Sequence, residues 1–364
     1  MTTGATMRAV VRRGPRLVVA EVPDAVPGPG QIVAKTLACG ICGSDLHAVH
    51  HLEHGVEIGR RSGAADTIDP AQDLVMGHEF CAEVLDHGPA TDHRFKTGTR
   101  VVSTPFAFGP LGPELIGFST RYRGAYAERV VLTEALLLPV PNGLSSDAAA
   151  LTEPLSVGEH AVAVAAPQPR SVALVVGCGP IGLAVITALK RRGIGPVIAA
   201  DFSPARRARA ERLGADIVVD PAASSPHAAW SSFDVPATLA ELGLAQMSGR
   251  TLRDAVVFEC VGVPGMLQSL IDHAPPTAHV VVVGACQEED RIQPVIAINK
   301  QLRFSFVFAY SPDEFARTLR ALSEGEIDAE VFLTGTVGLD ATADAFKRLE
   351  TPGDDVKVIV QPWC

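Results

Sequence analysis

Residues 172–182 read Val-Ala-Leu-Val-Val-Gly-Cys-Gly-Pro-Ile-Gly, an apolar run that leads directly into a G-x-G-x-x-G pattern. A continuous apolar run of this length is typical of a parallel strand that is buried on both faces. Glycine-rich turns often produce the pattern by chance, but here a strand precedes it and residues 181–192 predict a helix after it. Such glycines allow a tight turn, the approach of a pyrophosphate and close packing of helix on strand. The pattern predicts a dinucleotide-binding turn formed by Gly177, Gly179, Pro180, Ile181 and Gly182.

Strands and helices alternate after this turn. Residues 196–200 predict a second strand, and residues 204–213 predict a second helix with Ser203 as N-cap and Gly214 after its last turn. Further apolar runs predict strands at 217–219, 254–259 and 279–283. This repetition indicates an α/β fold with a doubly wound parallel sheet.

Asp201 closes the second strand. A carboxylate at this place accepts hydrogen bonds from the ribose hydroxyls and repels a 2′-phosphate, so the sequence predicts NAD rather than NADP. The nearby Arg206 and Arg207 weaken this preference because a basic residue there can accommodate a phosphate, and we interpret Arg206 as a contact of the adenine ribose. Ligands lie beyond the carboxyl ends of such strands. Further cofactor contacts are therefore expected at Cys260, Val261, Val283, Gly284 and Ala285.

Length and texture indicate two domains. A chain of 364 residues, 47% of them hydrophobic, is too long for one ordinary core. The first ~150 residues differ from the rest. They show poor helical periodicity, and glycine and proline separate short apolar runs at 17–22, 31–38 and 100–103. We expect a β-rich domain there.

Charge and cysteine usage indicate which kinds of binding partner and which cell compartment to expect. The net charge of −10 disfavours nucleic acid, and no apolar stretch reaches the ~20 residues that cross a bilayer. No apolar segment with a cleavage site follows the N-terminal arginines. The seven cysteines are spread over a long chain, which is typical of free thiols and metal ligands. We expect a cytoplasmic protein that acts on a small molecule, without a membrane or nucleic-acid partner.

The nonapeptide Cys39–His47 contains a C-x-x-C pair formed by Cys39 and Cys42. Such a pair alone indicates a redox site or half of a structural zinc site, but no second C-x-x-C exists. A catalytic zinc needs only three protein ligands. His78, Glu79 and Glu153 are candidates for the others. The polar setting of His50, His51 and His54 predicts an exposed loop instead.

Six features, in this order and at these separations, resemble the zinc-dependent medium-chain alcohol dehydrogenase family, nearest its sorbitol, threonine and butanediol dehydrogenase branch. They are Cys39–His47, Gly77–Glu79, Gly98–Val102, Glu153–His160, Gly177–Gly182 and Asp201. The resemblance implies a GroES-like catalytic domain (1–156 and 297–364) with a Rossmann domain inserted at 157–296. It also implies a homodimer or homotetramer.

The resemblance assigns roles around one catalytic zinc ion (Zn). Cys42, His78 and either Glu79 or Glu153 would bind it, and zinc would act as a Lewis acid on the alcohol oxygen while NAD takes the hydride. Ser44 and His47 would carry the proton to solvent. The resemblance gives Cys39 no ligand role. Asp45 would orient a metal ligand, and Val307, Phe308 and Lys357 would contact the cofactor.

Two departures from the family shape the expected function. Residues 105–123 contain no cysteine, so the structural zinc of many relatives is absent, and Ala309 stands where polyol dehydrogenases place a substrate-binding arginine. We therefore predict a secondary, aromatic or apolar alcohol as substrate, with Phe106, Phe108 and Phe118 as pocket candidates. The alternatives are a polyol or amino-alcohol dehydrogenase, a zinc-free NADPH quinone or enoyl reductase, and an inactive binding protein.

Overall fold

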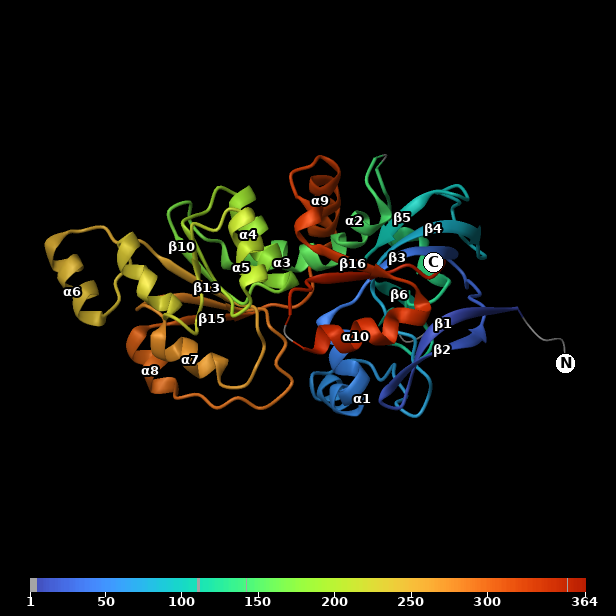
Figure 1. The fold of residues 1–364 in the computed structure, drawn as a ribbon, viewed down its shortest axis with the longest axis horizontal. Helices are drawn as coiled ribbons and strands as arrows, with labels where there is room; N and C mark the ends of the chain where they lie inside the picture. The colour runs from blue at the N-terminus through green and yellow to red at the C-terminus, as the bar shows by residue number, and fades with distance from the viewer. Residues whose placement is uncertain (1–4, 110–111, 142, 352) are drawn as a thin grey trace. The chain divides into compact units, whose positions relative to one another are not determined.

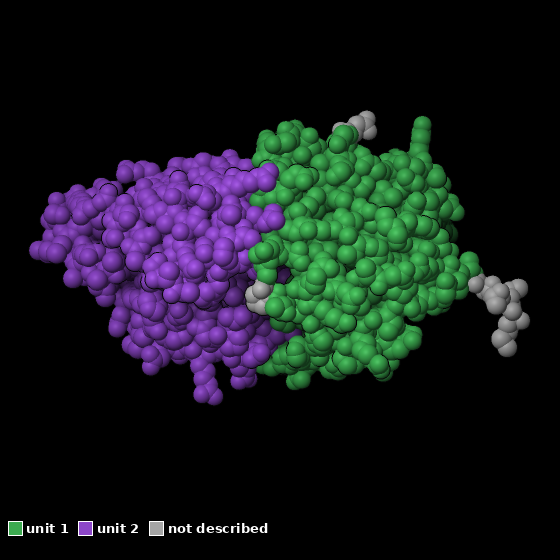
Figure 2. Space-filling view, in the orientation of Figure 1, with its two compact units in different colours: residues 1–153, 315–364 green, residues 154–314 purple. Residues whose placement is uncertain are grey.

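In a computed structural model, which describes residues 5–109, 112–141, 143–351 and 353–364, the chain forms two units (Figure 2). Unit 1 is Met1–Glu153 with Phe315–Cys364, and unit 2 is Pro154–Glu314. The second crossing lies within α9 (Pro312–Ser323) and not at the expected residue 297. The physical reason is that β15 (Arg303–Phe306) pairs with the sheet of unit 2, so residues 297–314 belong to the inserted domain.

Unit 2 is built on a six-stranded sheet in the order β12-β11-β10-β13-β14-β15, and every pairing in it is parallel. This confirms the Rossmann-like sheet. The central strand β10 occupies the predicted residues 172–176, and the side chains of its first four residues are fully buried because helices cover both faces. The other strands are β11 (Val197–Ala200), β12 (Ile217–Val219), β13 (Ala255–Glu259) and β14 (His279–Val282).

Helices cover the two faces of this sheet (Figure 1). On one face lie α4 (Pro180–Arg191) and α5 (Pro204–Arg212), and on the other lie α7 (Met266–His273) and α8 (Pro294–Lys300). The helix α6 (Leu239–Ser248) begins directly after Thr238, whose side chain caps it. The short helix η2 (Pro226–Phe233) precedes it.

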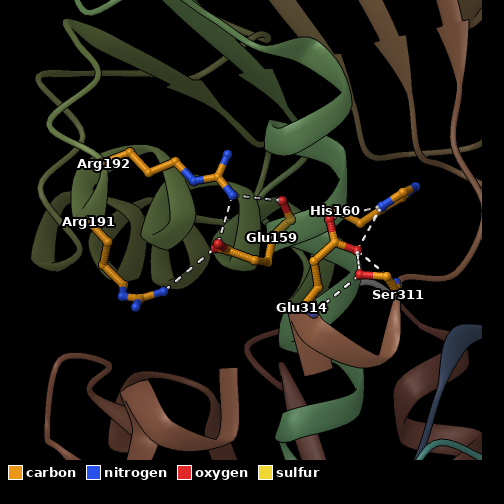
Figure 3. A network of polar contacts seen from close by, with 6 residues as sticks. All are labelled: Glu159, His160, Arg191, Arg192, Ser311 and Glu314. Atoms are coloured by element: carbon orange, nitrogen blue, oxygen red, sulfur yellow. Dashed lines mark hydrogen bonds and ion pairs between the residues drawn. The ribbon is translucent and has the colours of Figure 1, made fainter. Parts of the chain in front are cut away.

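Charged side chains of α3 (Thr152–Ala165) contact the end of α4 and the first residues of α9 (Figure 3). Glu159 forms ion pairs with Arg191 and Arg192 at the end of α4, at 3.6 and 2.7 Å. The His160 Nδ1 atom lies 3.0 Å from Glu314 Oε2, at the start of α9. The helix in which the chain enters unit 2 is thereby held to the helix in which it leaves.

Unit 1 is built on a sheet of seven strands, in the order β16-β17-β3-β4-β5-β9 with β8 paired to β3, and two hairpins, β1–β2 and β6–β7. Its strands are β1 (Thr6–Arg13), β2 (Arg16–Pro23), β3 (Gln31–Gly40), β4 (Glu79–His87), β5 (Arg100–Ser103), β6 (Phe106–Gly109), β7 (Gly112–Leu115), β8 (Arg129–Thr133), β9 (Leu137–Pro139), β16 (Leu333–Val337) and β17 (Lys357–Val360). Its remaining helices are α1 (Gly43–Arg61), α2 (Ser146–Ala150) and α10 (Thr342–Glu350), with the short helices η1 (Glu134–Leu136), η3 (Ala329–Val331) and η4 (Leu339–Ala341). The expected β-rich domain is confirmed.

The long helix α1 corrects the expectation of an exposed loop around His50, His51 and His54. These side chains are exposed, but they lie on the outer face of a helix whose other face is buried. Ala48, Val49, Leu52 and Val56 form that face, which polar neighbours concealed in the sequence. The helix kinks at His51, and the buried Arg12 donates to the carbonyl oxygen of Val49 at 3.3 Å.

Within the described residues, no helix has the length and apolar character needed to span a membrane.

Candidate metal centre and dinucleotide-binding turn

Three strands of unit 1 bring the candidate metal ligands together. Gly40 at the end of β3 pairs with Glu79 at the start of β4, and it also pairs with Ile359 of β17. Cys42 follows two residues after Gly40 as the N-cap of α1, and His78 directly precedes β4. The register of one antiparallel pair therefore places residues that are far apart in the chain side by side.

Cys42, His78 and Glu79 offer one sulfur, one nitrogen and one oxygen atom that all lie within 4.8 Å of one another. His78 and Glu79 are buried, and Cys42 is half-buried. Thiolate, imidazole and carboxylate are the ligands that zinc takes in proteins. Glu153 lies in the first turn of α3 and is near enough to raise the pKa of Lys357. It is not part of the group of three.

The charges around His78 fit a divalent cation. Burial by itself lowers the pKa of His78, but the negative charges of Asp45 and Cys42 outweigh it and raise this pKa well above the usual value. The His78 Nδ1 and Asp45 Oδ1 atoms are buried and 3.5 Å apart, and neither has a closer hydrogen-bond partner in the described part of the chain. A site that attracts positive charge this strongly is suited to a metal ion.

Lys357 supplies the cation that balances Glu79. Its Nζ atom lies 2.6 and 2.7 Å from the two carboxylate oxygens and donates to the carbonyl oxygen of Ile41 at 2.9 Å. Burial lowers the pKa of Lys357, but the negative charges of Glu79 and Cys42, with the hydrogen bonds to Glu79, together outweigh burial and raise this pKa above its usual value, so the ammonium stays charged. The expected contact of Lys357 with a cofactor is therefore not what this structure shows, because its side chain is 2% exposed and turned toward Glu79.

The residues of the expected proton relay lie on the exposed side of α1. Ser44 and His47 are three residues apart, which places them on one helix face, and both are exposed. Asp45 is fully buried on the other side and accepts the backbone N–H of Cys42 at 3.2 Å. Burial and the nearby charge of Asp45 raise the pKa of Cys39, so its thiol stays protonated.

One aromatic ring packs beside the metal group. The ring of Phe118 is 5.5 Å from the ring of His78, and Thr67 donates to the Phe118 carbonyl oxygen at 3.2 Å. Phe106 is half-buried in β6, whereas the Phe108 side chain is 54% exposed. Of the three phenylalanines considered for the pocket, Phe118 is the one that touches a candidate ligand.

The glycine-rich turn of unit 2 has the geometry that its pattern predicted. Gly177 has a φ of +90°, and a Cβ atom at Gly182 would lie 1.8 Å from the Gly177 carbonyl oxygen. A Cβ atom at Gly179 would meet no atom within 4 Å. The first and third glycines are needed by the fold itself, whereas the space beside the second is open. Gly179 is the N-cap of α4, with Pro180 in the first turn, so the positive end of this helix faces that space.

Asp201 reinforces this turn. Its two carboxylate oxygens accept the backbone N–H groups of Cys178 and Ser203, both at 2.7 Å. Arg207 forms an ion pair with Asp220 at 3.1 Å, so its guanidinium has a partner within the protein. Arg206 is half-buried in the first turn of α5. Each carboxylate oxygen can accept a second hydrogen bond, so the Asp201 carboxylate keeps acceptor capacity for ribose hydroxyls.

Glu259 is a functional candidate that sequence reasoning missed. It ends β13, is 1% exposed and accepts the N–H groups of Val261 and Gly262 at 2.7 and 2.8 Å. Its own carbonyl oxygen accepts the N–H of Gly284 at 2.9 Å. A glutamate at the end of an otherwise apolar strand was the available signal. It joins the strand ends that carry the expected contacts Cys260, Val261, Val283, Gly284 and Ala285.

The last expected cofactor contacts follow β15. The backbone N–H of Val307 donates to the Val282 carbonyl oxygen at 3.1 Å, which extends the sheet by one residue. Phe308 is 86% exposed, and Ala309 has a positive φ of 58°.

Comparisons with known proteins agree over nearly the whole chain. The family described as Alcohol dehydrogenase GroES-like domain matches residues 28–142, and the family described as Zinc-binding dehydrogenase matches residues 180–324. The (R,R)-butanediol dehydrogenase of Bacillus subtilis (strain 168) is 32% identical over 343 residues, which cover 92% of this chain and 93% of that protein. The sorbitol dehydrogenase of the same organism is 26% identical over 381 residues, with 99% of both chains covered.

Solved structures show the same arrangement. The crystal structure of 2R,3R-butanediol dehydrogenase from Bacillus subtilis matches with a TM-score of 0.76 and 28% identity, over 98% of this chain and 99% of that one. A structure described as a zinc-binding dehydrogenase from Sinorhizobium meliloti 1021, bound to NADP, matches with a TM-score of 0.78 over 98% and 100% of the two chains. Its 24% identity supports the fold alone.

Proposed function

The chain belongs to the zinc-binding, medium-chain alcohol dehydrogenase family, and on this premise we propose that it transfers a hydride between a secondary or apolar alcohol and NAD at one catalytic zinc ion. The observation that carries the proposal is the group formed by Cys42, His78 and Glu79, whose sulfur, nitrogen and oxygen atoms lie within 4.8 Å of one another. A zinc-free reductase has no need of such a group, and an inactive binding protein has no reason to keep it.

In this proposal the residues divide the work. Zinc bound to the group would act as a Lewis acid on the alcohol oxygen, and NAD would accept the hydride. Cys42 and His78 would hold the ion, and Glu79 or Glu153 would provide the third ligand. Ser44 takes the alcohol proton and passes it to His47, which is exposed to solvent.

The substrate is inferred from one contact of the metal group in unit 1 and from one residue of the sequence of unit 2. Phe118 presents an apolar face 5.5 Å from the His78 ring. Ala309 offers no guanidinium for the hydroxyls of a polyol. Both favour a secondary, aromatic or other apolar alcohol over sorbitol or threonine. The relatives, which include butanediol and sorbitol dehydrogenases, support the polyol alternative.

NAD is inferred from Asp201, whose carboxylate lies at the end of the second strand of the βαβ unit and would repel a 2′-phosphate. The dinucleotide itself would use the space beside Gly179 and the positive end of α4.

The experiment is metal analysis joined to an activity screen. Purified, dialysed protein should hold one zinc ion per chain and should reduce NAD with secondary and aromatic alcohols. Cys42→Ala should lose both zinc and turnover, whereas Cys39→Ala serves as the matched control and should keep the zinc. Glu79→Gln and Glu153→Gln identify the third ligand. The glutamate whose substitution causes the loss of zinc is the one that binds it. Full turnover by Cys42→Ala, or an active protein without metal, would refute the proposal.

We also propose that the protein is a homo-oligomer whose interface includes the free edge of β15. Val295, Ile298, Phe306 and Phe308 are 60–86% exposed next to this edge strand, whose outer side pairs with no strand among the described residues. An edge strand can pair with its own copy across a two-fold axis and cover such side chains. Light scattering should give a dimer or tetramer, and Phe306→Lys should weaken it. A monomeric wild type would contradict this.

A further inference from the structure

Tyr126 is a buried phenol next to the metal group that the proposed mechanism does not use. Its hydroxyl lies 2.6 Å from Asp45 Oδ2 and 3.0 Å from the carbonyl oxygen of Gly40. Burial and the negative charge of Asp45 raise the pKa of Tyr126 well above its usual value, so the hydroxyl keeps its proton. The hydroxyl has one proton to donate. Of its two neighbours, the Asp45 carboxylate is both the closer and the stronger acceptor, so Asp45 receives this hydrogen bond.

Asp45 lies next to two candidate metal ligands, Cys42 and His78. Its Oδ2 atom accepts the backbone N–H of Cys42 at 3.2 Å, and its Oδ1 atom lies 3.5 Å from His78 Nδ1. Asp45 is 0% exposed, so water does not compete for these oxygens. The direction in which Oδ1 points depends on how Oδ2 is held, because the two oxygens rotate as one rigid group.

Tyr126 is itself fixed in place by two close neighbours. Its ring meets the ring of Phe346 edge-on at 5.8 Å. Gly77, the residue before His78, also lies against Tyr126, because a Cβ atom there would come within 2.9 Å of the Tyr126 backbone nitrogen and ring. A phenol held this firmly fixes the position of the group that it hydrogen-bonds.

We propose that Tyr126 is a positioning residue of the metal site, whose hydroxyl holds the Asp45 carboxylate so that Oδ1 faces His78 Nδ1 and leaves Nε2 for the metal. The hydrogen bond made by one ring nitrogen sets which nitrogen of a histidine is free to bind a metal. This inference rests on the proposed function, because it requires that Cys42 and His78 bind zinc.

The test compares Tyr126→Phe with Tyr122→Phe in the full-length protein. Tyr122 is also a buried tyrosine of unit 1, but its hydroxyl donates to the Phe108 carbonyl oxygen at 3.2 Å, away from the metal group. The readouts are the zinc affinity of metal-free protein, measured by competition with a chromophoric chelator, and urea unfolding without metal. Zinc affinity should fall about 10- to 100-fold in Tyr126→Phe. It should change less than about 2-fold in Tyr122→Phe, because that substitution leaves Asp45 untouched.

A second variant keeps the test decisive if Tyr126→Phe folds poorly. Asp45→Asn also removes the charge that faces His78, so it should weaken zinc binding. If Tyr126 acts through Asp45, adding Tyr126→Phe to Asp45→Asn should weaken it little further. Additive losses, equal losses in the two tyrosine variants, or unchanged zinc affinity in Tyr126→Phe would each overturn the inference. Absence of zinc from the wild type would overturn the proposed function as well, whereas tight binding by both wild type and Tyr126→Phe would overturn this inference alone.

Discussion

Replacing Lys357 with methionine should destabilise the metal-free protein far more than the zinc-bound protein. Lys357 and Glu79 are 2% and 1% exposed, and the lysine Nζ atom contacts both carboxylate oxygens at 2.6–2.7 Å. The substitution keeps the apolar stem but leaves a buried carboxylate without a partner, which costs about 3–5 kcal/mol. That range includes the cost of losing the hydrogen bond to the Ile41 carbonyl oxygen. Zinc beside Glu79 would supply the missing positive charge, so the loss should shrink when the metal is bound.

Urea unfolding followed by circular dichroism, in EDTA and again with saturating zinc, measures both values. Lys347→Met is the matched control, because Lys347 pairs with Asp344 at the surface, where both side chains are more than 70% exposed. That pair should contribute less than about 1 kcal/mol, with or without zinc. Adding Glu79→Gln to Lys357→Met should recover much of the stability, since the isolated charge is gone. A loss below about 1 kcal/mol for Lys357→Met in EDTA, or an equal loss with zinc, would refute the reasoning.

The remaining predictions concern unit 2. Gly182→Ala should cost roughly 3 kcal/mol or more, because the added Cβ would lie 1.8 Å from a backbone oxygen. Gly179→Ala, with no atom within 4 Å, should keep its urea midpoint but bind NADH about tenfold more weakly in a fluorescence titration, and equal behaviour of the two variants would contradict the roles given to these glycines. Burial, with the charge of His273, lowers the pKa of His227 to about 4 from 6.5. Because the pKa of His227 is lower in the folded state than in the unfolded state, the neutral histidine contributes stability that is present above pH 6.5 and is lost as the pH falls toward 4. Because the site is partly solvated, the loss in the free energy of unfolding should be roughly 1–2 kcal/mol. The difference in urea midpoint between wild type and His227→Gln should therefore shrink as the pH falls over that range. Asp201→Asn should raise the ratio of kcat/KM with NADP to kcat/KM with NAD by about tenfold or more, and an unchanged ratio would remove Asp201 as the reason for the preference.

Local patterns predicted the parts of the fold that depend on neighbouring residues. The strand at 172–176 was recognisable because both of its faces are buried, so its apolar run is unbroken. The helix after Ser203 was recognisable by its cap and by Pro204. The helix α1 was not, because histidines and glutamates surround its apolar face and its kink interrupts the spacing.

The site divides in the same way. Cys42 and His78 belong to short motifs that the sequence displays, and the structure brings them together. The partners that support them are distant in sequence. Lys357 lies 278 residues from Glu79, and Tyr126 lies 81 residues from Asp45. No local pattern marks these pairs, because the register of β3, β4 and β17 creates the first of them and long-range packing creates the second.

The buried lysine beside Glu79 also bears on the order of events when the protein is made. Small zinc domains commonly stay unfolded until the metal arrives, because their ligands repel one another and little else holds the chain. Here an internal ammonium already offsets one of the carboxylates before any ion enters. We therefore expect the chain to fold without the metal and to take it up afterwards. Loss of the ion would leave a folded protein that can be refilled.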